Sequence, residues 1–308
     1  MNRITGIIAG LVMPGLMLVG AVLARQNVKA GRGDRRGAFR AAAAVFLLLL
    51  ASWFLGNNHV NSLDREISRF FSAVGTGLFE ASVVWLAYLG LEPYVRRFSP
   101  DSLIAWTRLL AGGWRDPRVG RDVMIGVAAG LGMTVVFAVH NLLPPLFGQL
   151  EPMPVPSDPT VLMSIRYVFA SILTQLQKAM ASGMLGIAGY VDFRMLLKHR
   201  SAAMLAAIVC YAGVVMNGMF TPASPMIDLT LGLLITSGFV IVVARAGLLA
   251  TIAALATHFI LLRAPLTTEV SSWQGTATLV FLGTILAAGL GGCYLASRAA
   301  PRAAARFS

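Results

Sequence analysis

The chain has 308 residues, of which 57% are hydrophobic and only 12% are charged, and its mean hydropathy is +0.74. A water-facing surface needs about 25% charged residues, so this composition excludes a soluble globular protein. The net charge of +12 does not indicate a nucleic-acid partner, because the basic residues lie in short clusters between apolar runs, as in membrane proteins.

Nine segments are apolar and long enough to cross a hydrocarbon core of about 30 Å as helices. This pattern predicts an all-α protein, a polytopic membrane helical bundle that forms a single domain over residues 1–308. In chain order, the predicted spans cover residues 4–24, 41–57, 69–91, 122–142, 168–193, 202–221, 227–244, 246–262 and 274–297.

The first span also has features of a secretory signal peptide, because Arg3 precedes its apolar run and small residues lie near Ala24. Cleavage after Ala24 would export the basic stretch that follows, which the usual distribution of positive charge in membrane proteins disfavours. We therefore expect an uncleaved first span, with cleavage as the alternative.

The segment 25–40 (RQNVKAGRGDRRGAFR) is predicted to be a short loop rich in glycine and arginine. Its charge suits anionic lipid head groups, and the candidate contacts are Arg32, Arg35 and Arg36. The letters GRGD within it match the GxGD signature of intramembrane aspartyl proteases, but that chemistry needs an aspartate inside the membrane beside a second one. Since Asp34 lies in a basic loop, we predict no protease site.

The segment 99–114 (SPDSLIAWTRLLAGGW) has the pattern of an amphipathic helix, with Ser99 at the N-cap and Pro100 at the first helical position. Its apolar residues recur at helical spacing, and they are Leu103, Trp106, Leu110 and Trp114. We expect an interfacial amphipathic helix on the cytoplasmic side, with a tryptophan-containing loop as the alternative. The candidate lipid or partner contacts here are Trp106, Arg108, Trp114, Arg115, Arg118 and Arg121.

The segment 143–160 contains six prolines and is predicted to be an irregular outer loop. The stretch that follows, residues 161–192, is too long for one upright crossing at 1.5 Å per residue. We expect an interfacial or tilted first part and then a true crossing.

Basic residues are distributed unevenly between the two sides of the predicted bundle. Nineteen of the 25 lysines and arginines fall on one side, and positive charge marks the cytoplasmic side of membrane proteins. The sequence therefore predicts an N-terminus outside, nine crossings and a cytoplasmic C-terminus, in the inner membrane of a bacterium. The segments on the basic side are residues 25–40, 92–121, 194–200, Arg245 and 298–308.

Motifs for catalysis or metal binding are missing from the sequence. It contains no GxSxG, HExxH or kinase motif, and its four histidines lack zinc-ligand spacing. Cys210 and Cys293 lie in apolar stretches without a CxxC pattern, so we predict buried thiols. We therefore expect no cofactor, no metal, no nucleic-acid partner and no enzymatic activity in this chain.

Small residues spaced four apart occur at Gly126 and Gly130 and again at Ala287 and Gly291. Such pairs let helix backbones approach closely in lipid. We interpret them as packing within the chain, with the contact surface of a homo-oligomer as the alternative.

Charged residues inside the predicted spans are the best indication of a functional site, because each costs at least about 2.5 kcal/mol at a helix centre unless it is paired or hydrated. Glu80 falls at the middle of its span, Lys178 at similar depth and His258 nearer the outer end. One interpretation is a proton- or solute-coupled site in which Glu80 pairs with Lys178 or His258. The other, which we favour, is structural: a pair that locks two helices together, or a protonated carboxyl group hydrogen-bonded to a neighbour. Residues near span ends, which head-group water can reach, are given little weight: His140, Asp192, Asn217 and Asp228.

Three segments are distinctive: 29–40 (KAGRGDRRGAFR), 91–122 (LEPYVRRFSPDSLIAWTRLLAGGWRDPRVGRD) and 264–275 (APLTTEVSSWQG). They resemble the polytopic membrane region that follows the catalytic domain in a group of bacterial receptor-like serine/threonine protein kinases. The resemblance implies a cytoplasmic kinase domain, a single crossing and an exported portion upstream, which agrees with the outside N-terminus. It implies no catalytic residue here, and the chain is expected to be either a stand-alone relative or a piece of a longer kinase.

The favoured hypothesis is a non-enzymatic membrane module that anchors a kinase, present in cis or in trans, or senses a signal for it. One alternative is a transporter or channel for a small solute that uses Glu80 and His258. Another is an intramembrane enzyme of unrecognised type, in which several ionisable residues near the spans would converge beside an open cleft.

Overall fold

The computed structural model describes residues 20–59, 61–148, 159–219 and 225–298. All regular structure in these ranges is helical, which confirms the predicted all-α bundle. A helix over residues 20–29 comes first. It is followed by α2 (Arg35–Gly56), α3 (Leu63–Phe98), the 3₁₀ helix η1 (Pro100–Leu103), α4 (Ile104–Leu110), α5 (Pro117–Leu146), the 3₁₀ helix η2 (Pro159–Leu162), α6 (Ile165–Leu197), α7 (Arg200–Met219), α8 (Pro225–Arg245), α9 (Gly247–Arg263) and α10 (Gly275–Ser297).

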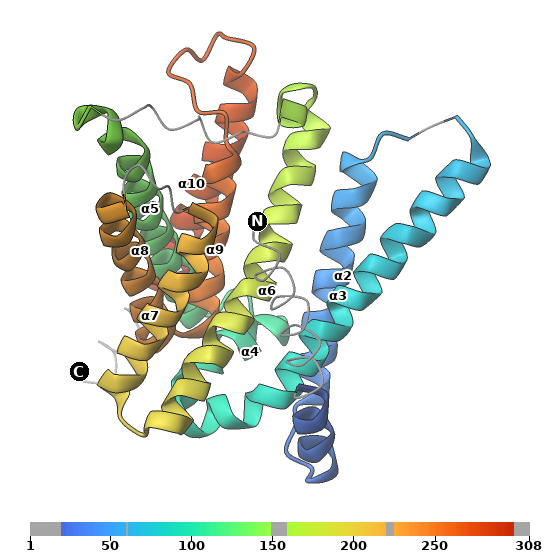
Figure 1. Ribbon diagram of the computed structural model, residues 1–308. Helices are drawn as coiled ribbons and strands as arrows, with labels where there is room; N and C mark the ends of the chain where they lie inside the picture. The colour runs from blue at the N-terminus through green and yellow to red at the C-terminus, as the bar shows by residue number, and fades with distance from the viewer. Residues whose placement is uncertain (1–19, 60, 149–158, 220–224, 299–308) are drawn as a thin grey trace, which may run out of the picture.

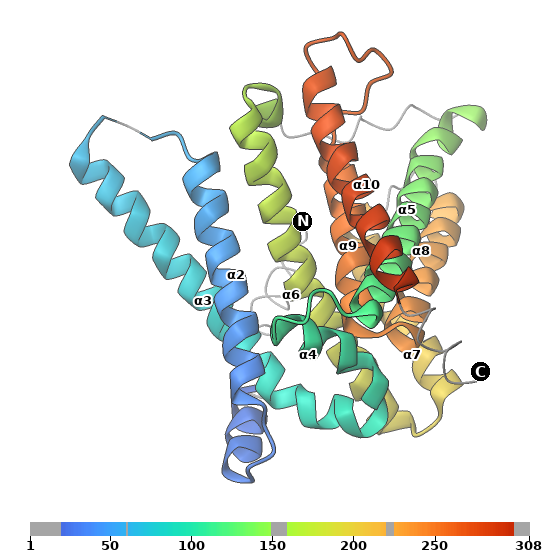
Figure 2. The same ribbon diagram turned by 180° about the vertical axis from the view of Figure 1, so that it is seen from behind.

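The helices form two groups that share α6 (Figures 1 and 2). On one side, α2 and α3 form a hairpin, and both contact α6. On the other side, α9 packs against α6 and α5, while α8 and α10 pack against α5. α7 lies between α6 and α8 and contacts both. α6 therefore lies between the hairpin and the larger helix group and contacts both.

The loops divide between two ends of the bundle (Figure 1). Residues 98–117 and 197–200 lie at one end, together with the turn before α9, where Gly247 packs against Ser102. We call this the basic end, because it gathers segments that the sequence predicts on the positively charged side. The loop 264–274 lies at the opposite end, which we call the far end.

Within the described ranges, five helices are long and apolar enough to cross a membrane: α2, α3, α5, α8 and α10. α7 and α9 are apolar but shorter. α6 is long, at 33 residues, but carries polar side chains near its middle. The predicted first span, 4–24, falls mostly outside the described residues, so nine crossings stay a prediction.

α3 is longer than its predicted span of 69–91. Its 36 residues measure about 54 Å at 1.5 Å per residue, more than a hydrocarbon core of about 30 Å. It runs at a slope beside α2 (Figure 1), as expected for a helix longer than the core it crosses.

Pro93 lies inside α3 and provides no N–H group for the carbonyl of Leu89, one turn earlier. Asn27, on the helix 20–29, supplies the missing donor. Its Nδ2 donates to the carbonyl oxygens of Leu89 and Gly90, each at 3.0 Å. The helix 20–29 is thereby tied to α3 at the point where a proline interrupts the backbone hydrogen bonds.

The structure corrects the prediction of one interfacial helix over residues 99–114. η1 and α4 end at Leu110, and the chain then turns at Gly112, whose φ of +90° favours glycine. Trp106 is 3% exposed because α4 packs against α2, α5 and α9, so this tryptophan lies in the protein core. Trp114 lies beyond the helix and is exposed.

Two neighbouring predictions also change. The predicted loop 143–160 starts as helix, since α5 continues to Leu146, and residues 149–158 lie outside the described part of the chain. An interfacial or tilted first part is predicted for residues 161–192; apart from η2, no separate interfacial helix precedes the continuous helix α6 in the described chain, and the tilted alternative stays a prediction. α6 is therefore one continuous helix from Ile165 to Leu197.

The predicted loop 25–40 is much shorter in the structure. Helix covers residues 20–29 and resumes at Arg35, so only residues 30–34 connect the two helices. Asp34 caps α2, since its Oδ1 accepts a hydrogen bond of 2.9 Å from the backbone N–H of Gly37. The aspartate of the GRGD letters therefore has a structural role at a helix start.

α5 and α9 pack closely through glycine. A Cβ atom at Gly126 would lie 2.5 Å from the carbonyl oxygen of Ala250, and one at Gly130 would lie 2.4 Å from that of Ala254. This first pair of small residues therefore packs within the chain, as interpreted from the sequence. In contrast, nothing lies within 4 Å of a Cβ at Gly291, on the outer surface of α10.

Cys210 and Cys293 are exposed, which corrects the prediction of buried thiols. They lie on the apolar helices α7 and α10, on the outside of the bundle. Apolar neighbours in the sequence of a membrane protein indicate contact either with lipid or with the protein core. The pattern alone does not distinguish the two.

Candidate functional site

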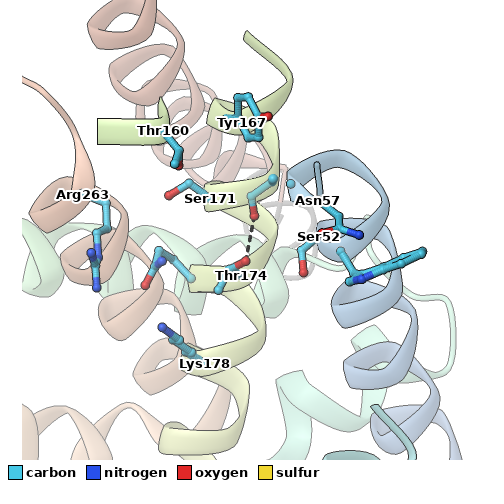
Figure 3. A pocket seen from close by; sticks show the side chains of 12 residues that line it. Ser52, Asn57, Thr160, Tyr167, Ser171, Thr174, Lys178 and Arg263 are labelled. Atoms are coloured by element: carbon cyan, nitrogen blue, oxygen red, sulfur yellow. Dashed lines mark hydrogen bonds between the residues drawn. The ribbon is translucent and has the colours of Figure 1, made fainter. Parts of the chain in front are cut away.

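A polar pocket of about 370 Å³ opens in the far half of the bundle, between the hairpin and the larger helix group (Figure 3). α6 supplies half of the residues that line it, and the last turn of α2 supplies most of the others. Thr160 of η2 and Arg263, the last residue of α9, complete the lining. The volume falls in the range of about 300 to 1,000 Å³ that is usual for small-molecule sites.

The α6 side of the pocket is a stripe of polar side chains at helical spacing. Tyr167, Ser171, Thr174 and Lys178 follow one another at intervals of three or four residues, so they share one face of the helix. Ser171, Thr174 and Lys178 all reach the same opening in Figure 3. Other faces of α6 carry mostly apolar residues, some packed in the core, as Val168 and Ile172 are, and some exposed, as Phe169 and Leu185 are.

Several polar groups in the pocket have no partner among the described residues. Gln175 is only 6% exposed, yet its side chain makes no hydrogen bond with the described part of the protein. The Nδ2 atom of Asn57 is buried and also lacks a partner. Lys178 and Arg263 form no ion pair within the described ranges. Buried polar groups are almost always hydrogen-bonded, so the buried amides of Asn57 and Gln175 indicate a bound molecule or ordered water, whereas Lys178 is exposed and Arg263 half-buried at the same cavity.

The charge of the described lining is positive. Lys178 and Arg263 contribute two cations from different helices, and no carboxylate is found among the described residues that line the pocket. Lysine and arginine only donate hydrogen bonds, so their partner has to be an acceptor from outside the lining. The arrangement is therefore suited to an anion, because Coulomb attraction is stronger between low-dielectric walls than in water.

The rim of the pocket is held by a chain of hydrogen bonds. Arg166 donates to the Tyr167 hydroxyl at 2.6 Å, and that hydroxyl donates to the side-chain oxygen of Asn58. Asn58 follows α2, whereas Tyr167 belongs to the first turn of α6. The contact fixes the mouth of the pocket by joining the two helices at the far end.

The structure gives Glu80 and Lys178 separate surroundings. Glu80 accepts a hydrogen bond from the amide of Gln177, which joins α3 to α6. Lys178, the next residue, points into the pocket on another face of α6 (Figure 3). No ion pair joins Glu80 to Lys178 in the described structure, and Glu80 does not line the pocket.

His258, the third predicted residue, lies on the opposite side of α9 from the pocket. Its Nδ1 shares a hydrogen bond of 3.0 Å with the Thr134 hydroxyl of α5, and its ring contacts Phe137 at a centroid distance of 6.0 Å. His258 is 7% exposed. It therefore joins α5 to α9 and does not meet Glu80 or Lys178 at a common site.

A second polar contact was given little weight from the sequence. His140 of α5 and Asp228 of α8 meet, with 2.6 Å between Nε2 and Oδ1. Their side chains are 12% and 3% exposed. Each residue falls near the end of a predicted span, so its depth in the membrane did not suggest a buried contact. The two residues are also 88 positions apart in the sequence, so no local pattern links them.

The arginines predicted to contact lipid or a partner are exposed at the basic end. Arg108 pairs with Asp116, and Arg121 pairs with Asp122 at 3.1 Å. The Arg115 guanidinium lies 4.4 Å from the centre of the Trp114 ring. The other exposed members of this predicted set are Arg32, Arg35, Arg36 and Arg118. Only Trp106 among the predicted contacts is buried.

Sequence reasoning identified Lys178 but missed the other pocket residues. The signal for them was the spacing of Ser171, Thr174 and Gln175 before Lys178, which puts four polar side chains on adjoining positions of one helix face. No comparable pattern marks Arg263, because basic residues are common at helix ends.

Comparisons with protein families, with curated proteins and with solved structures found no match for this chain. The resemblance to the membrane region of receptor-like kinases therefore depends on the three sequence segments alone.

Proposed function

We propose that this multi-pass membrane protein is a non-enzymatic sensor module that binds a small anionic ligand in the far-end pocket. The observation that carries the proposal is the pair of cations, Lys178 and Arg263, with no carboxylate among the described lining residues. Gln175 and Asn57 support it, because they offer further unused hydrogen-bonding groups.

A lipid tail is a poor occupant for this pocket. An unpaired lysine or arginine at the centre of a bilayer helix costs at least about 2.5 kcal/mol. A hydrocarbon chain offers no hydrogen-bond acceptor, so it leaves this cost in place. Water lowers the cost, and an anion lowers it further through charge-assisted hydrogen bonds.

The transport alternative receives less support from the geometry. Glu80 and His258, the residues on which that hypothesis depends, do not line the pocket. Each has a protein partner instead, Gln177 and Thr134 respectively. Both contacts join helices, which fits the interpretation of these residues as structural.

The binding proposal is tested with the purified protein in phosphatidylcholine nanodiscs, titrated with inorganic phosphate and followed by calorimetry. Replacing Lys178→Gln or Arg263→Gln removes a charged hydrogen bond worth about 1.5 to 3 kcal/mol, which weakens binding tenfold or more. Arg65→Gln, an exposed cation of α3 outside the pocket, is the matched control and leaves the affinity unchanged. If phosphate does not bind, or binds equally to all variants, the proposal is wrong.

For orientation, we propose that the basic end faces the cytoplasm of a bacterial cell, as the distribution of arginine and lysine suggests. Alkaline phosphatase inserted in the loop 264–274 should then be active, because the enzyme folds only outside the cytoplasm. The same reporter inserted at residues 111–113 should be inactive. The reverse result would invert the protein and place the pocket on the cytoplasmic side.

A signalling partner at the basic end completes the proposal, and the sequence resemblance suggests a serine/threonine kinase domain in cis or in trans. α6 supports communication, because one unbroken helix runs from the pocket to the basic end. Arg115 and Arg118 are exposed there and suit contact with a protein or with anionic head groups. Arg115→Gln with Arg118→Gln should preserve the fold but reduce kinase phosphorylation in membranes. Unchanged phosphorylation would contradict this part.

A further inference from the structure

The pocket has two chemically different ends, separated by the face of α6 (Figure 3). Lys178 and Arg263 point into the space between α6 and α9. Ser52 and Asn57 of α2 lie across the pocket from them. One end is therefore cationic, whereas the other presents only neutral hydroxyl and amide groups.

The geometry points to a phosphorylated polyol as the ligand, an inference that rests on the proposed binding function. We infer that the phosphate lies between Lys178 and Arg263 and that the hydroxyl-bearing part extends toward Ser52 and Asn57. Arginine and lysine are the usual partners of phosphate in proteins. Hydroxyl and amide side chains both donate and accept hydrogen bonds, which is what recognition of neighbouring alcohol groups requires.

The size of the pocket agrees with a ligand larger than a bare anion. A water molecule needs about 10 to 15 Å³ of probe volume, whereas this pocket offers about 370 Å³. Inorganic phosphate would fill the cationic end and leave the α2 end to water. A polyol phosphate would instead satisfy the buried amide groups as well.

Two amide side chains are available to bind the hydroxyl-bearing part of the ligand. The Nδ2 atom of Asn57 is buried without a partner, and Gln175 is more than nine-tenths buried without a side-chain hydrogen bond to the described residues. A site that leaves buried polar groups unpaired discriminates strongly against ligands that lack the matching group. Polyol phosphate should therefore bind more tightly than phosphate alone.

The same chemistry occurs in a free polyol phosphate and in the head group of a glycerophospholipid such as phosphatidylglycerol. The pocket lies in the far half of a membrane bundle, so either source could reach it. We therefore test glycerol phosphate in nanodiscs of phosphatidylcholine and in nanodiscs that contain phosphatidylglycerol. If glycerol phosphate binds with equal affinity in both kinds of nanodisc, the ligand is a free polyol phosphate. If phosphatidylglycerol competes with glycerol phosphate, the ligand is the lipid head group. Either result supports the shared chemistry.

The deciding titrations use glycerol phosphate, inorganic phosphate and glycerol with the full chain. We expect glycerol phosphate to bind at least tenfold more tightly than inorganic phosphate, and glycerol alone to bind too weakly to detect. Asn57→Ala combined with Gln175→Met should abolish that tenfold preference and leave phosphate affinity within twofold. Lys178→Gln should weaken both anions by a similar factor.

Equal affinities of the wild-type protein for phosphate and glycerol phosphate would overturn this inference but leave the proposed anion-binding function intact. A lack of phosphate binding would overturn both. If the double variant unfolds, Ser52→Ala is tested in its place. The Ser52 hydroxyl donates to the carbonyl of Leu49 at 2.8 Å, a bond within its own helix, so the substitution removes no hydrogen bond between helices. Its loss should reduce the preference for glycerol phosphate, and an unchanged preference counts against the inference.

Discussion

The two sides of the bundle use polar side chains differently. Where α5 meets α8 and α9, polar side chains join helices directly, as in the His140–Asp228 and Thr134–His258 contacts, although the Nδ1 atom of His140 is buried without a partner among the described residues. Around the pocket, the side chains of Gln175 and Lys178 on α6 face a cavity without partners in the described structure. The first region has the features of a structural core, and the second has those of a binding site.

Glycine contributes to the same difference. Gly126 and Gly130 allow α9 to approach α5 so closely that a Cβ atom would clash with backbone. The contact of α2 with α6 beside the pocket is less tight, since a Cβ at Gly56 would lie 3.1 Å from the Cβ of Ala170. The comparison teaches that stability and binding are separated between the two faces of this bundle, and variants can test that separation.

The largest effect is expected from the His140–Asp228 contact between α5 and α8. His140→Ala leaves the buried Asp228 carboxylate without this imidazole, and losing a hydrogen bond to a charged group costs about 1.5 to 3 kcal/mol. The free energy of unfolding in detergent micelles, measured by denaturant titration, should fall by about this amount. In a double-mutant cycle with Asp228→Ala, the two losses should be clearly less than additive. Additive losses would mean that the pair is not coupled.

The glycine seam should give the next largest effect. Gly130→Ala places a Cβ 2.4 Å from the carbonyl oxygen of Ala254, so the helices must move apart at a cost of about 1 to 3 kcal/mol. Gly132→Ala on the same helix meets nothing within 4 Å and should be neutral or slightly stabilising. Thermal unfolding of both variants provides the measurement. Equal effects would contradict the close packing of α5 and α9.

A much smaller change is expected in the pocket. Lys178 is exposed and has no ion-pair partner among the described residues, so Lys178→Met should change the free energy of unfolding by about 0.5 kcal/mol or less. The same variant should lose phosphate binding. A destabilisation of more than about 1 kcal/mol would show that Lys178 has a structural role and would remove the contrast between the two regions.

The smallest effect concerns the connection between α2 and α3, at the far end. The carbonyl of Phe54 and the carboxylate of Glu66 raise the pKa of His59 above its usual value of 6.5. A group with a raised folded-state pKa stabilises the fold below pH 6.5 and loses that contribution as the pH rises through the folded value. Hydrogen exchange of this connection should therefore be slower, after correction for intrinsic rates, at pH 6 than at pH 8.5. His59→Gln should remove that dependence.

Hydrophobic periodicity predicted most of the fold, because each crossing must present apolar residues over about 20 positions. It predicted the helix ends less well. α3 continues past 69–91 because water-exposed turns remain helical, and Trp106 packs inward although its spacing is also typical of a helix on the membrane surface. Sequence patterns cannot distinguish a core from a lipid-facing surface, which also explains the exposed Cys210 and Cys293.

The candidate site was only partly predictable. Depth and charge identified Lys178, but they also suggested a common site for Glu80 and His258, which the structure places in separate helix contacts. The rotation of α6 decides this, because it directs Gln177 toward α3 and Lys178 into the pocket. Partners such as Arg263 lie on distant helices, and their proximity follows from tertiary packing that no local pattern encodes.

The central claim, that the pocket is an aqueous anion site, is tested most directly by cysteine labelling. In a protein without Cys210 and Cys293, Ser171→Cys should react with a charged, water-soluble thiol reagent in nanodiscs, and phosphate should slow the reaction. Ser82→Cys, on the exposed surface of α3, is the lipid-facing control and should stay unreactive. Unreactive Ser171→Cys, or labelling that phosphate does not slow, would contradict the account.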